Sequence, residues 1–172
     1  TVTAKPNAGA DQTVCAGTNA TLTGTSPTTG TWTAQSGNPV GATLGGTAGG
    51  VASVSFATTA SGAYNFIYTA NGCTDTMSVT VTAKPNAGAD QTVCAGTSAT
   101  LTGTSPTTGT WSSQSGNPVG STLGSTVGGV ASVSFATTAS GTYNFIYTAN
   151  SCTDTMSVTV TAKPNAGADQ TV

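Results

Sequence analysis

Hydrophobic and polar residues alternate along this chain in short segments, and the two-residue period is that of β-strands. The clearest segment places Ala52, Val54 and Phe56 on one face and serines on the other. Strands are predicted at residues 11–14, 19–25, 30–35, 52–56, 64–68 and 76–81, with one or two short edge strands in the glycine-rich stretch 36–50. About seven strands in one such span are typical of an immunoglobulin-like (Ig-like) β-sandwich.

The whole pattern occurs twice with few changes. The string TVTAKPNAGADQTV begins at Thr1, Thr80 and Thr159, so the period is 79 residues. Aligning residues 1–79 with 80–158 leaves eight differences, all between small residues. The predicted organisation is the end of a preceding repeat at 1–5, Ig-like repeats at 6–84 and 85–163, and the first strand of a third repeat at 164–172. Proline at each repeat boundary stiffens the joint, which favours domains stacked end to end.

The inward positions of the predicted strands define a core in each repeat. Its members are Leu22, Trp32, Phe56, Tyr64, Phe66 and Val79 in the first repeat, and Leu101, Trp111, Phe135, Tyr143, Phe145 and Val158 in the second. A single Trp on the third strand suits an Ig-like sandwich, and Tyr64 at the start of its strand resembles a tyrosine corner. Alternation points Ile67 outward. The aromatic side chains are therefore expected in the core and not on a sugar- or base-stacking surface.

The composition argues against most catalytic and ligand-binding chemistry. The chain has three Lys, five Asp and no His, Arg or Glu, so the usual general bases are absent. The first repeat keeps only Asp11 and Asp75, which the expected strand order places near opposite ends of the domain. Without His or a Cys-x-x-Cys pair, neither a metal site nor a cofactor is predicted. No basic patch indicates nucleic-acid binding, and no apolar run reaches the roughly 18 residues of a membrane helix.

Three segments of each repeat carry a family resemblance. They are GADQTVCAGTNATLTG at 9–24, the lone Trp32, and GAYNFIYTANGCTDTMSVTV at 62–81. This pattern resembles the PKD-like and Ig-like repeats of giant cell-surface adhesins of gliding Gram-negative bacteria. The resemblance implies secretion to the outer cell surface, extended arrays and a structural or adhesive role, without identifying a surface or glycan ligand.

Three functions fit these observations. The first is a structural repeat of a long extracellular fibre or adhesin, whose partners are neighbouring repeats of the same chain. The second is a self-assembling filament of identical chains, because nearly uncharged strands lack the Lys and Glu that block edge pairing. The third is a carbohydrate-binding module of a secreted protein, which would need exposed aromatic residues that the pattern does not offer. An enzyme is not expected.

The four cysteines are predicted to pair between repeats. In an Ig-like strand order the first and last strands run in the same direction, which puts Cys15 and Cys73 at opposite ends of the domain. A disulfide needs Cα atoms within about 7 Å. Cys15 is therefore expected to bond to Cys152, and Cys73 and Cys94 to bond to neighbouring repeats. The alternatives are a bridge within each domain, if the first strand is misplaced, and unpaired thiols.

The family resemblance also implies two glycosylation candidates. Asp75-Thr76-Met77 and Asp154-Thr155-Met156 match the Asp-Ser/Thr-apolar acceptor pattern of related surface proteins. Alternation turns Thr76 outward, where a glycan would fit. Thr76 and Thr155 are thus O-glycosylation candidates, and the alternative is a short motif that arises by chance in a Thr-rich chain.

Overall fold

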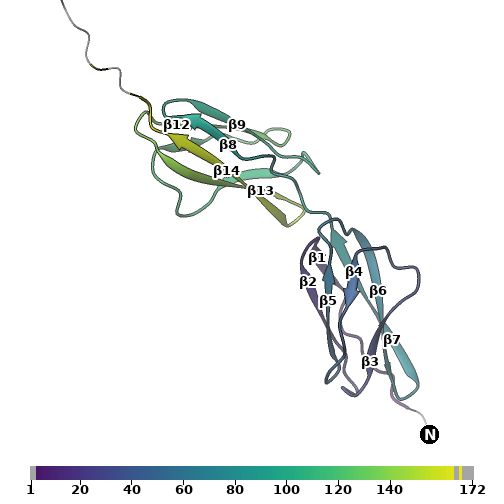
Figure 1. Ribbon diagram of the computed structural model, residues 1–172. Coiled ribbons are helices and arrows are strands. Elements are labelled where there is room, and N and C mark those ends of the chain that lie inside the picture. Colours follow the sequence, from purple (N-terminus) through teal and green to yellow (C-terminus); the bar gives the residue numbers. More distant parts are fainter. Residues whose placement is uncertain (1–2, 165–166, 168–172) are drawn as a thin grey trace, which may run out of the picture. The chain divides into compact units, whose positions relative to one another are not determined.

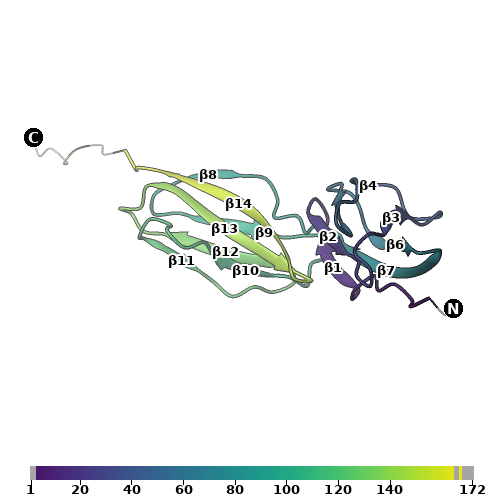
Figure 2. The same cartoon turned by 90° about the horizontal axis from the view of Figure 1, so that it is seen from below.

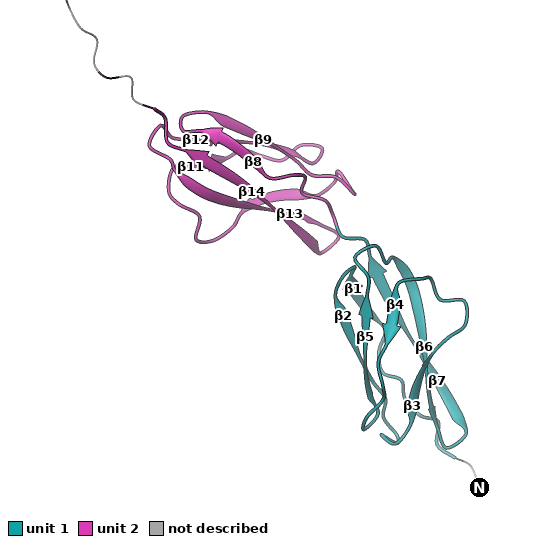
Figure 3. Cartoon of the chain, in the orientation of Figure 1, with its two compact units in different colours: residues 1–84 teal, residues 85–172 magenta. Residues whose placement is uncertain are grey.

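The computed structural model describes residues 3–164 and 167, and the chain divides into two compact units, Thr1–Lys84 and Pro85–Val172 (Figure 3). Among the described residues all regular structure is β-strand, with seven strands in each unit (Figure 1). The predicted fold class, tandem Ig-like β-sandwiches, is confirmed. The strand predicted at 164–172 lies almost entirely outside the described residues.

The first unit contains two sheets. Its strands are β1 (Gln12–Cys15), β2 (Asn19–Thr23), β3 (Thr31–Ala34), β4 (Ala42–Leu44), β5 (Val51–Phe56), β6 (Gly62–Ala70) and β7 (Cys73–Thr82). One sheet has the order β1-β7-β6-β3 and the other β2-β5-β4. The glycine-rich stretch supplies one edge strand, β4, which pairs with β5.

The second unit repeats this arrangement. Its strands are β8 (Gln91–Cys94), β9 (Ser98–Thr102), β10 (Thr110–Ser113), β11 (Ser121–Leu123), β12 (Val130–Phe135), β13 (Gly141–Ala149) and β14 (Cys152–Thr161). The sheets have the orders β8-β14-β13-β10 and β11-β12-β9, and Figure 2 shows the two layers of this unit.

The first and last strands of each repeat are parallel neighbours. In the first repeat Gln12 lies beside Val79, and Cys15 lies beside Thr82. The other strand pairs of this unit are antiparallel. The expected common direction of the first and last strands is therefore correct. The strand itself begins one residue later than predicted, so that Cys15 is its last residue.

The core lies between the two sheets of each repeat. Strand β5 alternates strictly between exposed and buried residues, as its sequence indicates. All twelve side chains predicted for the core are at most 6 % exposed. Tyr68, Met77 and Val54 join them at no more than 1 % exposure. Ile67 is half-buried and is paired with Thr33 of β3 and Thr76 of β7.

Hydrogen bonds from buried aromatic groups tie loops to the core. The Tyr68 hydroxyl donates to the Pro27 carbonyl (2.7 Å) and accepts from the Gly30 amide (2.9 Å). The Tyr64 hydroxyl donates to the Val40 carbonyl (2.8 Å), 24 residues upstream. The tyrosine-corner interpretation is wrong, because such a Tyr bonds only a few residues upstream. Tyr64 instead anchors the loop between β3 and β4.

Candidate functional site

The cysteines of the first repeat lie at opposite ends of one strand. Cys73 begins β7, and Cys15 lies beside Thr82, the last residue of that strand. Cys73 and Thr82 are nine positions apart along β7, which is about 30 Å at ~3.3 Å per residue. A disulfide tolerates a Cα separation of only about 7 Å. A Cys15–Cys73 bridge within the repeat is therefore excluded.

The second repeat has the same geometry. Cys152 begins β14, and Cys94 lies beside Thr161 at the other end of that strand. A bridge between Cys94 and Cys152 is excluded for the same reason. The alternative of one disulfide inside each domain is thus wrong for both repeats.

Only two of the four cysteines are oxidised. Cys15 and Cys152 are disulfide-bonded, whereas Cys73 and Cys94 are free thiols. Each bonded cysteine is less exposed than its counterpart in the other repeat: Cys15 is half-buried where Cys94 is exposed, and Cys152 is buried where Cys73 is half-buried. In both repeats the bonded cysteine is out of reach of the other cysteine of the same repeat.

The segment that enters the first repeat is fixed to the sandwich. Pro6 and Ala8 are buried. Asn7 and Thr25 exchange backbone hydrogen bonds of 2.9 and 2.8 Å, which join this segment to the chain just after β2. The segment is therefore part of the domain and does not behave as a flexible linker.

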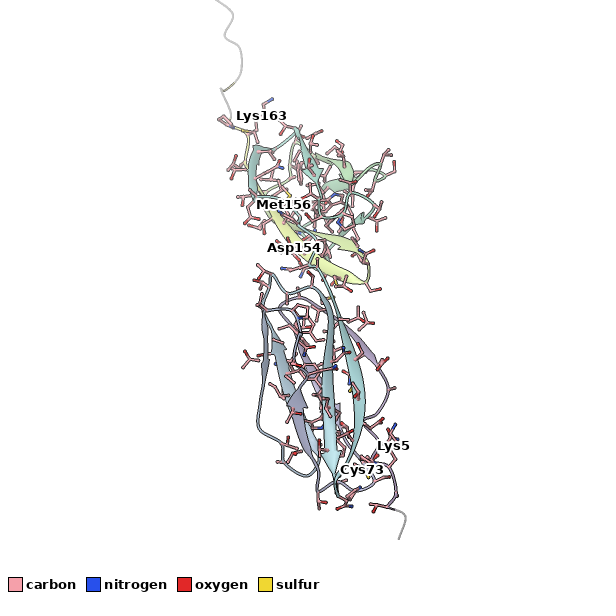
Figure 4. The ribbon with its side chains drawn as sticks, turned by 90° about the vertical axis from the view of Figure 1, so that its right-hand side faces the viewer. Lys5, Cys73, Asp154, Met156 and Lys163 are labelled. Carbon is pink, nitrogen blue, oxygen red and sulfur yellow. The ribbon has the colours of Figure 1, made fainter. Side chains whose placement is uncertain are left out.

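Asp75, near the start of β7, also holds this incoming segment, and we call the contact the Asp75 anchor. Its Oδ2 accepts from the Ala8 amide (2.8 Å), and its Oδ1 lies 2.6 Å from Lys5 Nζ. The hydrogen bond from Lys5, followed by that from the Ala8 amide, lowers the pKa of Asp75. Figure 4 shows Lys5 and Cys73 at the same end of the first repeat. The carboxylate thus connects the incoming chain to the end of the sandwich where Cys73 lies.

The second repeat begins in the same way. Pro85 and Ala87 are buried, and the Ala87 amide donates to Asp154 Oδ2 (2.9 Å). In Figure 4, Asp154 and Lys163 lie toward opposite ends of this repeat, as the direction of β14 requires. Only two residues, 83 and 84, separate the end of β7 from Pro85. The connection between the repeats is therefore very short.

The second carboxylate of the first repeat also has a structural role. Asp11 Oδ1 accepts from the Ser78 amide of β7 (2.8 Å). Ser78 and Asp75 are three residues apart on the same strand, so the expectation that Asp11 and Asp75 lie near opposite ends of the domain is wrong. It failed because Asp11 directly precedes the first strand and Asp75 lies near the start of the last one, and these two strands run in the same direction. Both carboxylates bind backbone amides and reinforce the sandwich.

The remaining candidates can be located in the structure. Thr76 and Thr155 are exposed on β7 and β14, and O-glycosylation there stays a prediction. All ten aromatic side chains are buried, so they form no surface for stacking sugars. Over the described ranges there is no cavity and no cluster of three His, Cys, Asp or Glu residues. The same residues contain no helix long and apolar enough to cross a membrane.

Sequence reasoning missed the anchor at the start of each repeat. Its signal is the recurrence of Lys-Pro-Asn-Ala with an Asp 70 residues after the Lys, at Lys5 and Asp75 and again at Lys84 and Asp154. Two residues of opposite charge at a constant spacing in a chain with so few charges indicate a contact. Only the three-dimensional structure shows that Lys5 and Asp75 meet at one end of the first repeat.

Comparisons with known proteins give structural similarity at low sequence identity. No protein-family model and no curated protein matches the chain. A tandem of two titin Ig domains is similar at 15 % identity and a TM-score of 0.31, over 90 % of this chain and 94 % of that one. A fragment of three titin Ig domains is similar at 15 % identity and a TM-score of 0.38, over 92 % of this chain and 63 % of that one. An endo-fucoidan hydrolase of glycoside hydrolase family 107 is similar at 11 % identity and a TM-score of 0.37, over 92 % of this chain and 34 % of that one.

Proposed function

We propose that this chain is a structural repeat segment of a long extracellular fibre or adhesin whose joints are stapled by disulfides. The staple joins Cys15 of one repeat to Cys152 of the next. The observation that carries the proposal is that both residues are disulfide-bonded although neither can reach the other cysteine of its own repeat. The role is mechanical: each repeat holds its own core, and copy number sets the reach of the fibre.

The contacts within each repeat support this pairing. Cys15 lies beside Thr82, where the chain leaves the first repeat. Cys152 begins β14, and Asp154, two residues later, binds the Ala87 amide where the chain enters the second repeat. Five residues of chain from Thr82 to Ala87 extend to at most about 18 Å. A connection this short is compatible with the proposed bond between Cys15 and Cys152.

The free thiols fit the same scheme. Cys94 is the counterpart of Cys15, and Cys73 is the counterpart of Cys152. In a longer array Cys94 bonds to the following repeat and Cys73 to the preceding one. Every joint then carries one disulfide. A segment of two repeats has one complete staple and two free thiols, those of Cys73 and Cys94.

An extracellular location suits this chemistry. Structural disulfides form and persist in oxidising compartments and are rare in the cytosol. With 5 % charged residues, solubility depends mainly on neutral hydroxyl and amide groups, and exposed Thr76 and Thr155 would carry glycans that add to it. We place the fibre on the outer surface of a Gram-negative bacterium, in line with the resemblance of its repeats to the surface adhesins of gliding species.

Length measurements on arrays of different copy number test this function. Proteins with two, four and eight copies of the 79-residue repeat are oxidised and imaged by electron microscopy. Stapled joints predict thin single threads whose length rises in proportion to copy number, by about 35–40 Å per repeat. Compact particles whose size grows only as the square root of copy number would show flexible joints and contradict the proposal.

A second function, a filament of laterally paired chains, is favoured by the sheet edges. Strands β2, β3 and β4 each lie at the edge of a sheet, and none contains a charged residue. Charged residues normally protect such edges from pairing with another chain. The same micrographs distinguish the two functions, because lateral pairing predicts regular bundles that thicken with protein concentration, whereas a fibre segment stays single.

A further inference from the structure

We infer that the staple is a force shunt, which removes the body of the repeats from the path of tension. The inference rests on the proposed pairing of Cys15 with Cys152. With that bond in place, a pull on the two chain ends travels from residue 1 to Cys15, crosses the disulfide, and continues from Cys152 to residue 172. The 136 residues from 16 to 151 carry no covalent load.

Without the disulfide each repeat must bear the full tension. Force enters the first repeat through β1 and leaves it through β7. Because these strands are parallel, the pull draws them in opposite directions and shears their pairing from Gln12–Val79 to Cys15–Thr82. Once β1 and β7 separate, the force pulls directly on the remaining strands, and the whole repeat unfolds. The parallel patch is therefore the mechanical clamp of the reduced chain.

The disulfide changes which strands are loaded. Tension now runs along β1 as far as Cys15, its last residue, and passes to Cys152, the first residue of β14. Strand β7 is outside this path, so β1 is no longer sheared against it. In the second repeat tension runs along β14 while β8 is outside the path. The two parallel patches are spared, and the Ig-like cores stay folded under load.

The length of the loaded path makes the shunt measurable. Residues 1–15 and 152–172 extend to roughly 120–130 Å at 3.3–3.6 Å per residue. The complete chain of 172 residues extends to roughly 570–620 Å. The staple therefore reduces the maximum extension about fivefold.

The shunt operates only while the disulfide is oxidised. Forming the bond removes two protons and two electrons from the thiols of Cys15 and Cys152, and a small-molecule disulfide such as oxidised glutathione accepts them and becomes two thiols. Excess dithiothreitol reverses the reaction and is itself oxidised to its cyclic disulfide. An oxidised array thus keeps its repeats folded under load, whereas a reduced array lengthens when its repeats unfold.

Single-molecule pulling on the 172-residue protein tests the shunt. Handles are attached at both chain ends by chemistry that does not use thiols, and peptide mapping of the same oxidised sample establishes the disulfide. Oxidised protein should reach its limit without releasing a repeat. With dithiothreitol the same molecules should gain roughly 450–490 Å from residues 16–151, in two unfolding events.

Matched variants identify the bond responsible. Cys15→Ser combined with Cys152→Ser should extend fully without reductant. Cys73→Ser combined with Cys94→Ser removes the two free thiols and should stay short. Asp11→Ala removes the carboxylate that holds the Ser78 amide beside the clamp, so it should lower the first unfolding force in the Cys15→Ser background and leave the extension of the oxidised parent protein unchanged.

The outcomes separate the shunt from the proposed function. Full release of two repeats from oxidised protein in which the Cys15–Cys152 bridge has been mapped would overturn the shunt and leave the staple in place. Mapping that finds no such bridge would overturn the staple and the shunt together, whereas the length of the threads would still test the fibre.

Discussion

Asp75 illustrates how one side chain organises the start of a repeat. Its two carboxylate oxygens bind the Lys5 ammonium and the Ala8 amide, so the incoming chain is held against β7. Both interactions favour the ionised carboxylate, and they lower the pKa of Asp75. A group whose pKa is lower in the folded state than in the unfolded state stabilises the fold at neutral pH, and its contribution disappears as the pH falls through the folded pKa.

The first prediction is that Asp75→Asn weakens the acid sensitivity of the fold. The parent protein should lose more stability than the variant between about pH 6 and about pH 3, because only the parent loses the ionised carboxylate. Chemical denaturation at both pH values measures the two differences. Asp11→Asn is a control for the removal of a carboxylate from the same strand region. Equal losses in the parent and in Asp75→Asn would contradict this role of the anchor.

The second prediction concerns Gly50, whose φ is +77°. A Cβ there would lie 2.6 Å from the Gly24 carbonyl oxygen, and the Gly50 carbonyl itself accepts from the Trp32 indole (2.9 Å). Gly50→Ala should destabilise the first repeat by about 2 kcal/mol or more, because strain and a clash act together. Gly46→Ser is the matched control: nothing lies within 4 Å of its Cβ, and the second repeat has Ser125 there. Calorimetric midpoints lowered equally by both variants would contradict the argument.

The third prediction is glycosylation of native material at Thr76 and Thr155, both of which are exposed. Intact mass should exceed that of the polypeptide, and replacing both residues with Ala should abolish the excess. Thr74→Ala with Thr153→Ala, two residues away on the same outward face, is the control. A native mass equal to that of the polypeptide would show that the motif arose by chance.

The residues that differ between the repeats also follow from the fold. All eight positions are exposed or half-buried in both repeats, and none belongs to a core. Five of them lie between 33 and 48, in and around β3, β4 and their connecting loop. This distribution favours drift at tolerant surface sites. It also explains why the two repeats have the same strand register.

At the scale of elements, the pairing of β1 with β7 is the contact that the proposed path of tension loads in the reduced protein. Strand β1 is only four residues long. Asp11, just before it, adds a further bond to β7 by accepting from the Ser78 amide. At the other end of β1, Ala16, the residue after Cys15, donates its amide to the Thr82 carbonyl (2.8 Å). A short parallel patch with a fastening at each end resists shear better than the strand pairing alone.

The fourth prediction tests the fastening at Asp11. Asp11→Ala should lower the free energy of unfolding by about 1 kcal/mol, the usual contribution of one partly solvated hydrogen bond. Asp90→Ala should have the same effect, because Asp90 accepts from the Ser157 amide at the same distance, 2.8 Å. Asn19→Ser, which reproduces the second repeat, serves as a neutral control. Urea titration measures all three, and no loss in either Asp variant would contradict this role.

The strands themselves could be predicted because alternation is a local property of the sequence. Period-two patterns locate β5 to β7 and identify their buried faces, which is why Phe56, Phe66 and Val79 could be assigned to the core. Alternation does not indicate which residue lies beside which on a neighbouring strand. The Asp75 anchor, the Asp11 fastening and the bond from Tyr64 to Val40 depend on such long-range pairing, and the sequence reasoning therefore missed them.

At the scale of the whole molecule, the repeat period connects fold and function. Because Cys15 lies where the chain leaves a repeat and Cys73 lies where it enters, each repeat carries one cysteine at each of its two ends. The sequence alone predicted this arrangement from the common direction of the first and last strands. With the proposed staple at every joint, copying a single unit would give a covalent fibre of any length.

The measurement that tests this account most directly is non-reducing peptide mapping of the oxidised protein. The peptides can be told apart, because that of Cys15 contains Asn19 and that of Cys152 contains Ser151. The account predicts that Cys15 is recovered bonded to Cys152, with Cys73 and Cys94 recovered as alkylated thiols. Recovery of Cys15 bonded to Cys73 would contradict the strand order, the staple and the force shunt together.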